Sequence, residues 1–188
     1  VRNSVKAVVD AYDGTVTLYE WDEDDPVLAS WRRAFPDTVQ PRSEIPDELM
    51  AHLRYPEDLF KIQRSLLAAY HVTDAPLFYG GQDRWIVPND PTVAPQEDFQ
   101  PPYYQTIQMP DADQPHFSLT TTYVPQNRQN LAGFMAVNAD ARSEDYGTIR
   151  ILRLPGNTQI AGPGQVANDF ETDPEVARTS LLFRISLI

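Results

Sequence analysis

The chain has no cysteine among its 188 residues. Disulfides, thiolate metal sites and cysteine nucleophiles are therefore excluded, although the absence of cysteine does not define a compartment. Apolar runs of about 18 residues are also missing, so the sequence contains no candidate membrane span. It shows no signal-peptide pattern either. Histidine is scarce, with three residues in all.

Positive charge is in short supply as well. The chain carries 15 Lys and Arg against 27 Asp and Glu, which gives a formal net charge of −12. Its only basic cluster is the pair Arg32 and Arg33. Because phosphate neutralisation supplies most of the affinity for nucleic acids, we exclude nucleic acid as the main partner. The same charge argues against anchoring to an anionic lipid surface.

Apolar residues make up 41% of the chain, which is enough to form a core. We predict one soluble domain over residues 1–188. It starts with a β-hairpin, because alternating runs over 5–9 and 15–19 flank Asp13-Gly14, a pair typical of type I′ turns. A helix follows, with Asp25 as its cap and apolar residues at helical spacing. A second, short helix is predicted from Pro46 to about Arg54.

Residues 52–74 indicate the main helix, opened by Pro56 and bracketed by His52 and His71. Acidic residues fill its first turn, and Glu57 can pair with Lys61 one turn on. We predict that one stripe of apolar side chains is buried and the opposite face is exposed. The predicted buried residues are Leu59, Ile62, Leu66 and Tyr70, and the predicted exposed residues are Lys61, Arg64, Ser65 and Ala68.

Beyond a proline-rich loop at about 86–102, the pattern changes from helical to alternating. Four strands are predicted, at 103–109, 116–124, 131–139 and 147–154. Without helices between them, they indicate an antiparallel meander. A glycine-rich turn and a C-terminal helix follow. The predicted fold class is therefore α+β, with an N-terminal β-hairpin and helices, an antiparallel β-meander and a C-terminal helix.

Several polar groups could carry chemistry. The acidic run 22–25 offers oxygen ligands but lacks the spacing of a calcium loop, so a solvated helix cap is favoured. His52, His71 and His116 stand too far apart in sequence to indicate a zinc site, and structural roles are favoured. His71 would lie at a helix C-terminus, where partial protonation is favourable.

Nucleophile and phosphate-binding motifs are absent or incomplete. No G-x-S-x-G elbow is present, and Ser118 with Thr120–Thr122 is interpreted as one polar face of a sheet. The members of a triad meet only in space, so sequence leaves a triad open. The GPGQV segment at 162–166 lacks the phosphate-loop pattern and favours a tight turn with positive φ.

Aromatic side chains gather around the proline-rich loop. Most of them are expected to pin the loop onto the core. Binding of carbohydrate, peptide or lipid is the alternative. The residues are Tyr79, Trp85, Phe99, Tyr103 and Tyr104.

Five blocks of the sequence, in order, resemble the UPF0182 family of bacterial membrane proteins. They lie at 1–22, 52–63, 70–74, 130–138 and 162–166. The resemblance implies a large protein with several N-terminal transmembrane helices, followed by a long region outside the cytoplasmic membrane that would include this chain. Both chain ends are expected to be cuts in that longer protein. The family has no accepted catalytic motif, so no functional residue is carried over.

We therefore assign no catalytic, cofactor-binding or metal-binding residue and no cofactor. The predicted function is an extracytoplasmic binding or interaction domain of a multi-spanning membrane protein. Its expected partner is the membrane-embedded remainder of the same chain, and its ligand is open. One alternative is an envelope hydrolase with a site assembled from dispersed residues such as His52 and His71. Another is an assembly domain of an oligomeric transporter or channel, which would form a homo-oligomer.

Overall fold

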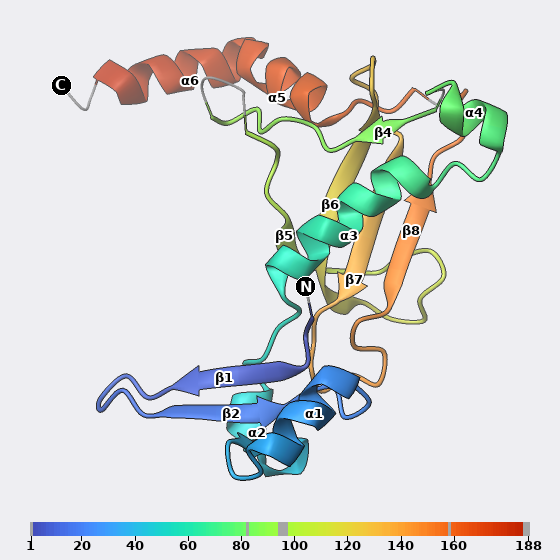
Figure 1. The fold of residues 1–188 in the computed structure, drawn as a ribbon. Coiled ribbons are helices and arrows are strands. Elements are labelled where there is room, and N and C mark those ends of the chain that lie inside the picture. The colour runs from blue at the N-terminus through green and yellow to red at the C-terminus, as the bar shows by residue number, and fades with distance from the viewer. Residues whose placement is uncertain (1, 82, 94–97, 158, 186–188) are drawn as a thin grey trace.

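A computed structural model describes residues 2–81, 83–93, 98–157 and 159–185. The molecule has three parts, visible in Figure 1: an N-terminal lobe, a central sheet crossed by a long helix, and a pair of C-terminal helices. The fold is α+β, as the segregated runs of helices and strands predict. Within the described ranges, no helix combines the length and the apolar composition needed to cross a membrane.

The N-terminal lobe is a three-stranded sheet with short helices. Strands β1 (Val5–Val9) and β2 (Val16–Glu20) pair antiparallel, and β3 (Val39–Gln40) pairs parallel with β2. The helices of this lobe are α1 (Pro26–Ala34), the 3₁₀ helix η1 (Arg42–Glu44) and α2 (Asp47–Met50). Trp21, Ile45 and Ala141 form the core of the lobe.

Two details of this lobe differ from the predictions. Only Gly14 has a positive φ in the hairpin loop, and the backbone pairs Asp10 with both Thr15 and Gly14. The loop is therefore longer than a two-residue type I′ turn, and that prediction is wrong. Helix α2 also ends at Met50 instead of near Arg54. After the helix, the Arg54 guanidinium donates to the carbonyl oxygens of Ala51 and Leu53, which holds these residues in a turn.

Helix α3 (Glu57–Tyr70) packs across the central sheet, as Figure 1 shows. Its buried residues are Phe60, Arg64 and Ala68, so the predicted orientation is wrong. Of the predicted buried stripe, Leu59 is half-buried, while Ile62, Leu66 and Tyr70 are 42%, 54% and 66% exposed. The buried row through Arg64 and the exposed row through Leu66 both have helical spacing. Contacts with the sheet decide which of the two rows of α3 is buried. The predicted Glu57–Lys61 ion pair is confirmed and forms on the helix surface at 2.6 Å.

The central sheet is antiparallel throughout. Its strands are β4 (Trp85–Ile86), β5 (Tyr103–Ile107), β6 (His116–Pro125), β7 (Gly133–Asn138) and β8 (Ile149–Arg153). The path β5–β6–β7–β8 confirms the predicted meander, and β4 pairs with the far end of β6. Part of the predicted loop, residues 94–97, lies outside the described residues. The main core lies between α3 and the sheet and includes Phe60, Leu119, Tyr123 and Val137.

The hydroxyl residues of β6 do not form one polar face. Ser118, Thr120 and Thr121 are buried, and neighbouring residues on a strand point to opposite faces. The hydroxyl of Thr120 donates to the Tyr103 carbonyl, and that of Thr121 accepts from Arg64. The prediction is therefore wrong for Thr121, whereas Ser118, Thr120 and Thr122 alternate along β6 and share the other face.

Three more helices complete the chain. Helix α4 (Ala75–Tyr79), which sequence reasoning missed, starts at an Asp74 cap that accepts from the Leu77 amide. The predicted C-terminal helix comprises α5 (Pro163–Thr172) and α6 (Pro174–Ile185), which extend away from the sheet in Figure 1. Helix α5 exposes Val166 and Phe170.

Candidate functional site

The three histidines lie in different parts of the molecule. His52 is exposed after α2, His71 caps the C-terminus of α3, and His116 begins β6. His71 Nδ1 lies 3.2 Å from the Leu67 carbonyl oxygen, which matches the predicted place at a helix end. The structure thus brings none of the three histidines together.

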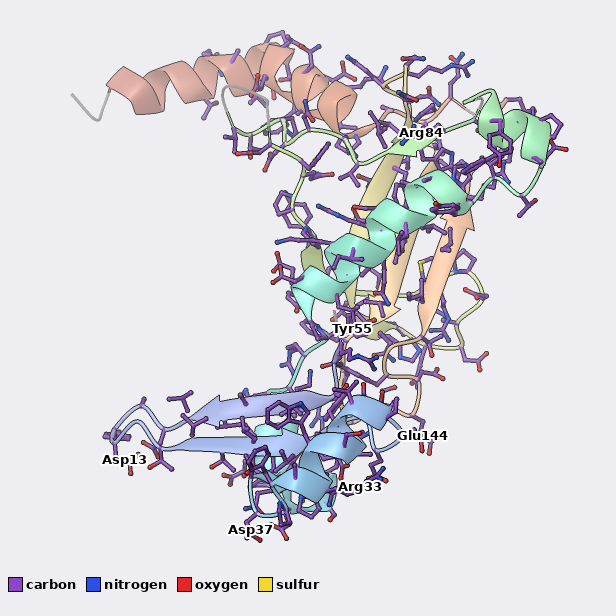
Figure 2. The ribbon with its side chains drawn as sticks, viewed as in Figure 1. Asp13, Arg33, Asp37, Tyr55, Arg84 and Glu144 are labelled. Carbon is purple, nitrogen blue, oxygen red and sulfur yellow. The ribbon has the colours of Figure 1, made fainter. Side chains whose placement is uncertain are left out.

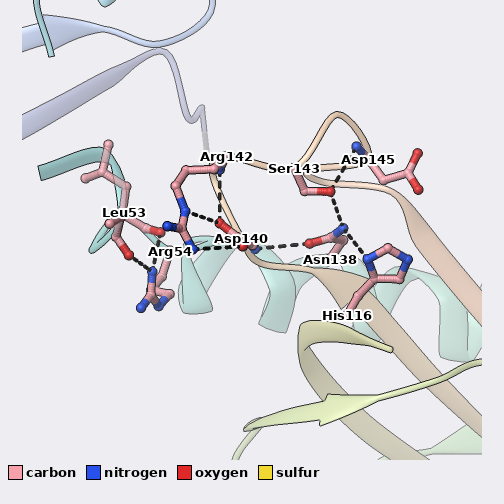
Figure 3. A network of polar contacts seen from close by, with 9 residues as sticks. Leu53, Arg54, His116, Asn138, Asp140, Arg142, Ser143 and Asp145 are labelled. Atoms are coloured by element: carbon pink, nitrogen blue, oxygen red, sulfur yellow. Dashed lines mark hydrogen bonds and ion pairs between the residues drawn. The ribbon is translucent and has the colours of Figure 1, made fainter. Parts of the chain in front are cut away.

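His116 belongs to a polar network at the lower end of the sheet (Figure 3). Asn138 Nδ2 lies 3.3 Å from His116 Nδ1 and 2.9 Å from Ser143 Oγ. The amide therefore stands between the imidazole and the hydroxyl, where a triad needs direct contact. Asn138 Oδ1 accepts from the Asp140 amide, and the Arg142 amide lowers the pKa of Asp140. The network holds the 138–143 turn in place.

The acidic run 22–25 acts as a helix cap, as predicted. Asp25 accepts from the amides of Val27 and Leu28 and from the Ser4 hydroxyl, and it pairs with Arg2 at 2.6 Å. The Ser4 hydrogen bond leads the causes that hold the pKa of Asp25 far below its ordinary value. In the described part of the chain, no three His, Asp or Glu side chains gather as metal ligands do.

The GPGQV segment starts helix α5, with Gly162 as N-cap and Pro163 in the first turn. Neither glycine of the segment has a positive φ, so that part of the prediction is wrong. Gly162 is required for a different reason. A Cβ there would lie 2.0 Å from the Gln129 carbonyl oxygen, because the two backbones touch.

The aromatic residues near the proline-rich loop divide into two groups. Trp85 is buried, and Tyr104 donates to the Tyr55 carbonyl and stacks on Phe117, so these two anchor their segments. Tyr79 and Phe99 are 87% and 64% exposed. Tyr103 is 45% exposed as well, so the prediction that the aromatics pin the loop holds for Trp85 and Tyr104 and not for the other three.

A pocket of about 810 Å³ is a candidate binding site among the described residues. We call it the arginine pocket. It lies between the α4–β4 connection, the β6–β7 connection at 125–132 and the residues that follow β8. Its charged lining residues are Asp83, Arg84, Arg128 and Arg153. A surface with three arginines and one aspartate is locally positive, whereas the whole chain is strongly negative.

One wall of the arginine pocket is built by Asp83 and its neighbours. Asp83 has a φ of 58°, in the left-handed region where non-glycine residues are uncommon. It pairs with Arg153 at 2.6 Å. Behind it the His71 ring stacks on Trp85, with centroids 3.8 Å apart. His71 Nε2 is buried without a hydrogen-bond partner among the described residues and lies 4.0 Å from the Asp83 carboxylate.

Beside the arginine pocket, α3 and α4 expose a row of apolar side chains, which we call the outer stripe. The ring of Tyr70 stacks on Phe78 at 5.5 Å, which links the two helices. Leu77 belongs both to the outer stripe and to the lining of the arginine pocket. The outer stripe comprises Ile62, Leu66, Tyr70, Leu77 and Tyr79, all exposed.

Sequence reasoning missed both features. Arg84, Arg128 and Arg153 each lie next to a turn or a strand end, which is a usable signal for surface charge. Their separations of 44 and 25 residues, however, give no hint that they meet. The outer stripe was missed because its α3 residues were predicted to be buried.

Residues 1–183 match the profile of the "Uncharacterised protein family (UPF0182)". A UPF0182 protein of Thermobifida fusca (strain YX) is 59% identical over 181 residues, covering 96% of this chain and 18% of the relative. One of Streptomyces coelicolor is 55% identical over 184 residues, covering 98% and 18%. No solved structure matches the chain.

Proposed function

Because this chain belongs to the UPF0182 family and spans about 18% of the length of these relatives, we propose that it is an interaction domain of a larger membrane protein. In this proposal the domain lies outside the cytoplasmic membrane. It binds the remainder of its own chain, which includes the membrane-embedded part.

The outer stripe is the observation that carries this proposal. Three of its residues occupy one face of α3 at helical spacing, and none of them is needed for the core below. A contiguous exposed apolar surface on a folded domain is typical of an interaction site. The relatives are several times longer than this chain, so in the proposal further sequence of the same protein covers the outer stripe.

The hydrolase alternative receives no comparable support. Among the described residues, no histidine side chain makes a hydrogen bond to a Ser, Asp or Glu side chain, and the one His–carboxylate pair, His71 and Asp83, is 4.0 Å apart. The assembly alternative predicts a second copy on the same surface, so one experiment separates it from the lead proposal.

Site-specific photo-crosslinking in the full-length protein tests the partner. Leu66 is replaced by benzoylphenylalanine, and Glu144, an exposed residue far from the stripe (Figure 2), is replaced in a matched control. We expect Leu66 to crosslink to peptides of the same chain outside this domain, and the control to give no such peptides. Crosslinks from Leu66 solely to a second copy, or none, would overturn the proposal.

The location is tested with cysteine labelling, since the domain has no cysteine of its own. Asp37→Cys places a thiol at an exposed position of the N-terminal lobe (Figure 2). A membrane-impermeant maleimide should label this variant in intact cells, while the parent protein shows the background. Labelling that appears only after permeabilisation would contradict an extracytoplasmic domain.

A further inference from the structure

We propose that the arginine pocket binds the phosphate group of an organic phosphate ester. This inference goes beyond the proposed function, because it concerns the charged concavity and not the outer stripe. It rests on the charge of the lining, the unused donors of two arginines, and the shape and composition of the space.

The lining of the arginine pocket is positive, whereas the chain as a whole is negative. Acidic residues outnumber basic ones by 27 to 15, so a randomly chosen surface hollow would be negative. This pocket instead gathers Arg84, Arg128 and Arg153 from three separate segments. Its one carboxylate, Asp83, is already paired with Arg153. The field inside the concavity therefore favours an anion.

Two of the arginines have unused hydrogen-bonding capacity. Among the described residues, the guanidinium groups of Arg84 and Arg128 make no hydrogen bond, ion pair or ring contact. Asp169 lines a neighbouring hollow that shares Arg128, yet it does not pair with it. A guanidinium offers five N–H donors in a planar fork that matches the oxygens of a phosphate. Two such groups on residues that line one pocket can hold a phosphate from two sides.

The third arginine is held in place by its surroundings. Arg153 Nη2 contacts Asp83 Oδ2 at 2.6 Å, and its guanidinium lies 5.9 Å from the centroid of the Trp85 ring. The backbone of Asp83 lies in the left-handed region. Backbone outliers of this kind concentrate at ligand-binding sites. A fixed arginine beside two free ones gives the pocket one rigid and two adaptable donors.

The volume and the remaining lining indicate more than an inorganic ion. A space of about 810 Å³ is within the range of small-molecule sites and much larger than a lone phosphate requires. Leu77, Leu131 and Leu154 add apolar surface, and Gln126, Asn127 and Asn130 add amide groups. The chemistry thus fits a ligand with a doubly charged phosphate and an organic body.

The chain carries its own reporters for a test. It has three tryptophans, of which only Trp85 lines the pocket, while Trp21 and Trp31 lie in the N-terminal lobe. Phenyl phosphate is titrated while the indole N–H signals are followed by NMR. We expect a saturable shift of the Trp85 signal and constant Trp21 and Trp31 signals. Phenol, which lacks the phosphate, should give no saturable shift.

Matched variants connect the shift to the arginines. The double variant Arg84→Gln/Arg128→Gln should weaken binding by about tenfold or more, because charge-assisted hydrogen bonds are lost. Arg33→Gln removes one positive charge at the opposite end of the molecule (Figure 2) and should leave binding unchanged. All the arginines replaced are exposed, so thermal unfolding should be that of the parent.

Further binding measurements identify the source of the phosphate group. Inorganic phosphate should compete with phenyl phosphate, and added salt should weaken both. Vesicles of phosphatidylglycerol test a lipid headgroup as the source; binding that the double variant abolishes would support the same phosphate chemistry in a lipid. If no probe binds, or if the double variant binds as well as the parent, the proposal is overturned.

Discussion

The inner face of α3 buries an arginine one turn from Phe60 and Ala68, whereas the outer face exposes Ile62, Leu66 and Tyr70. On the inner face, Arg64 donates to the Gln100 carbonyl at 2.8 Å and contacts the Thr121 hydroxyl at 3.4 Å. Burial lowers the pKa of Arg64, and these hydrogen bonds offset part of its desolvation. Nothing described covers the outer face. The contrast teaches that the sheet determines which side of α3 is buried, while the apolar residues on the other side stay exposed among the described residues.

The largest effect is expected from a truncation on the inner face. Phe60 is fully buried and contacts the main core, so Phe60→Ala leaves a cavity and should lower the free energy of unfolding by about 3–5 kcal/mol. Urea unfolding of the parent and the variant measures the difference. A loss below about 1 kcal/mol, typical of surface changes, would break the assignment of the inner face.

A smaller effect is expected where a polar group supports the inner face. The Tyr123 hydroxyl is buried, donates to the Arg64 carbonyl at 3.0 Å and lies 3.2 Å from the Met135 sulfur. Tyr123→Phe should lower the free energy of unfolding by about 1 kcal/mol at neutral pH. Tyr12→Phe, at a fully exposed position, is the matched control and should change nothing.

The same tyrosine makes the inner face sensitive to alkali. Burial raises the pKa of Tyr123 above its ordinary value of 10.0, so the folded chain keeps a proton that the unfolded chain releases. Stability should therefore fall as pH rises above about 10. Tyr123→Phe should make this fall shallower, although Tyr146, whose pKa burial raises to about 12, contributes in the same direction. An unchanged slope in the variant would contradict the buried state of Tyr123.

The smallest effect is expected on the outer face. Leu66→Ser changes a half-exposed side chain that the core does not need, so the free energy of unfolding should stay within about 0.5 kcal/mol of the parent. Urea unfolding at two protein concentrations measures it. A loss that grows with protein concentration would instead indicate that copies of the domain cover the outer stripe in solution.

Local chemistry made much of the fold predictable. The Asp25 cap before Pro26, the start of α3 after Pro56 and the alternation along β6 and β7 are each written in a few neighbouring residues. The Glu57–Lys61 pair followed from helical spacing in the same way. Where prediction failed, two local patterns were equally good. The rows through Ile62 and through Arg64 have the same helical period. A long side chain such as that of Arg64 can be buried when a carbonyl oxygen accepts a hydrogen bond from its guanidinium group.

The candidate site was beyond sequence reasoning for a related reason. Arg84, Arg128 and Arg153 are ordinary surface residues in their own segments, and only the pairing of β4 with β6 and of β7 with β8 brings those segments together. Gly162 is similar, because its small size is needed against the Gln129 backbone and not for a turn of its own.

The sequence by itself determined the acidic character, the order of the longer elements and the membership of the UPF0182 family, since these depend on composition, spacing and similarity along the chain. The tertiary structure decided which face of α3 is buried and which charges share a pocket. Both depend on contacts between segments distant in sequence, where the hydrogen bonds available to a side chain, and not its local pattern, determine whether it can be buried.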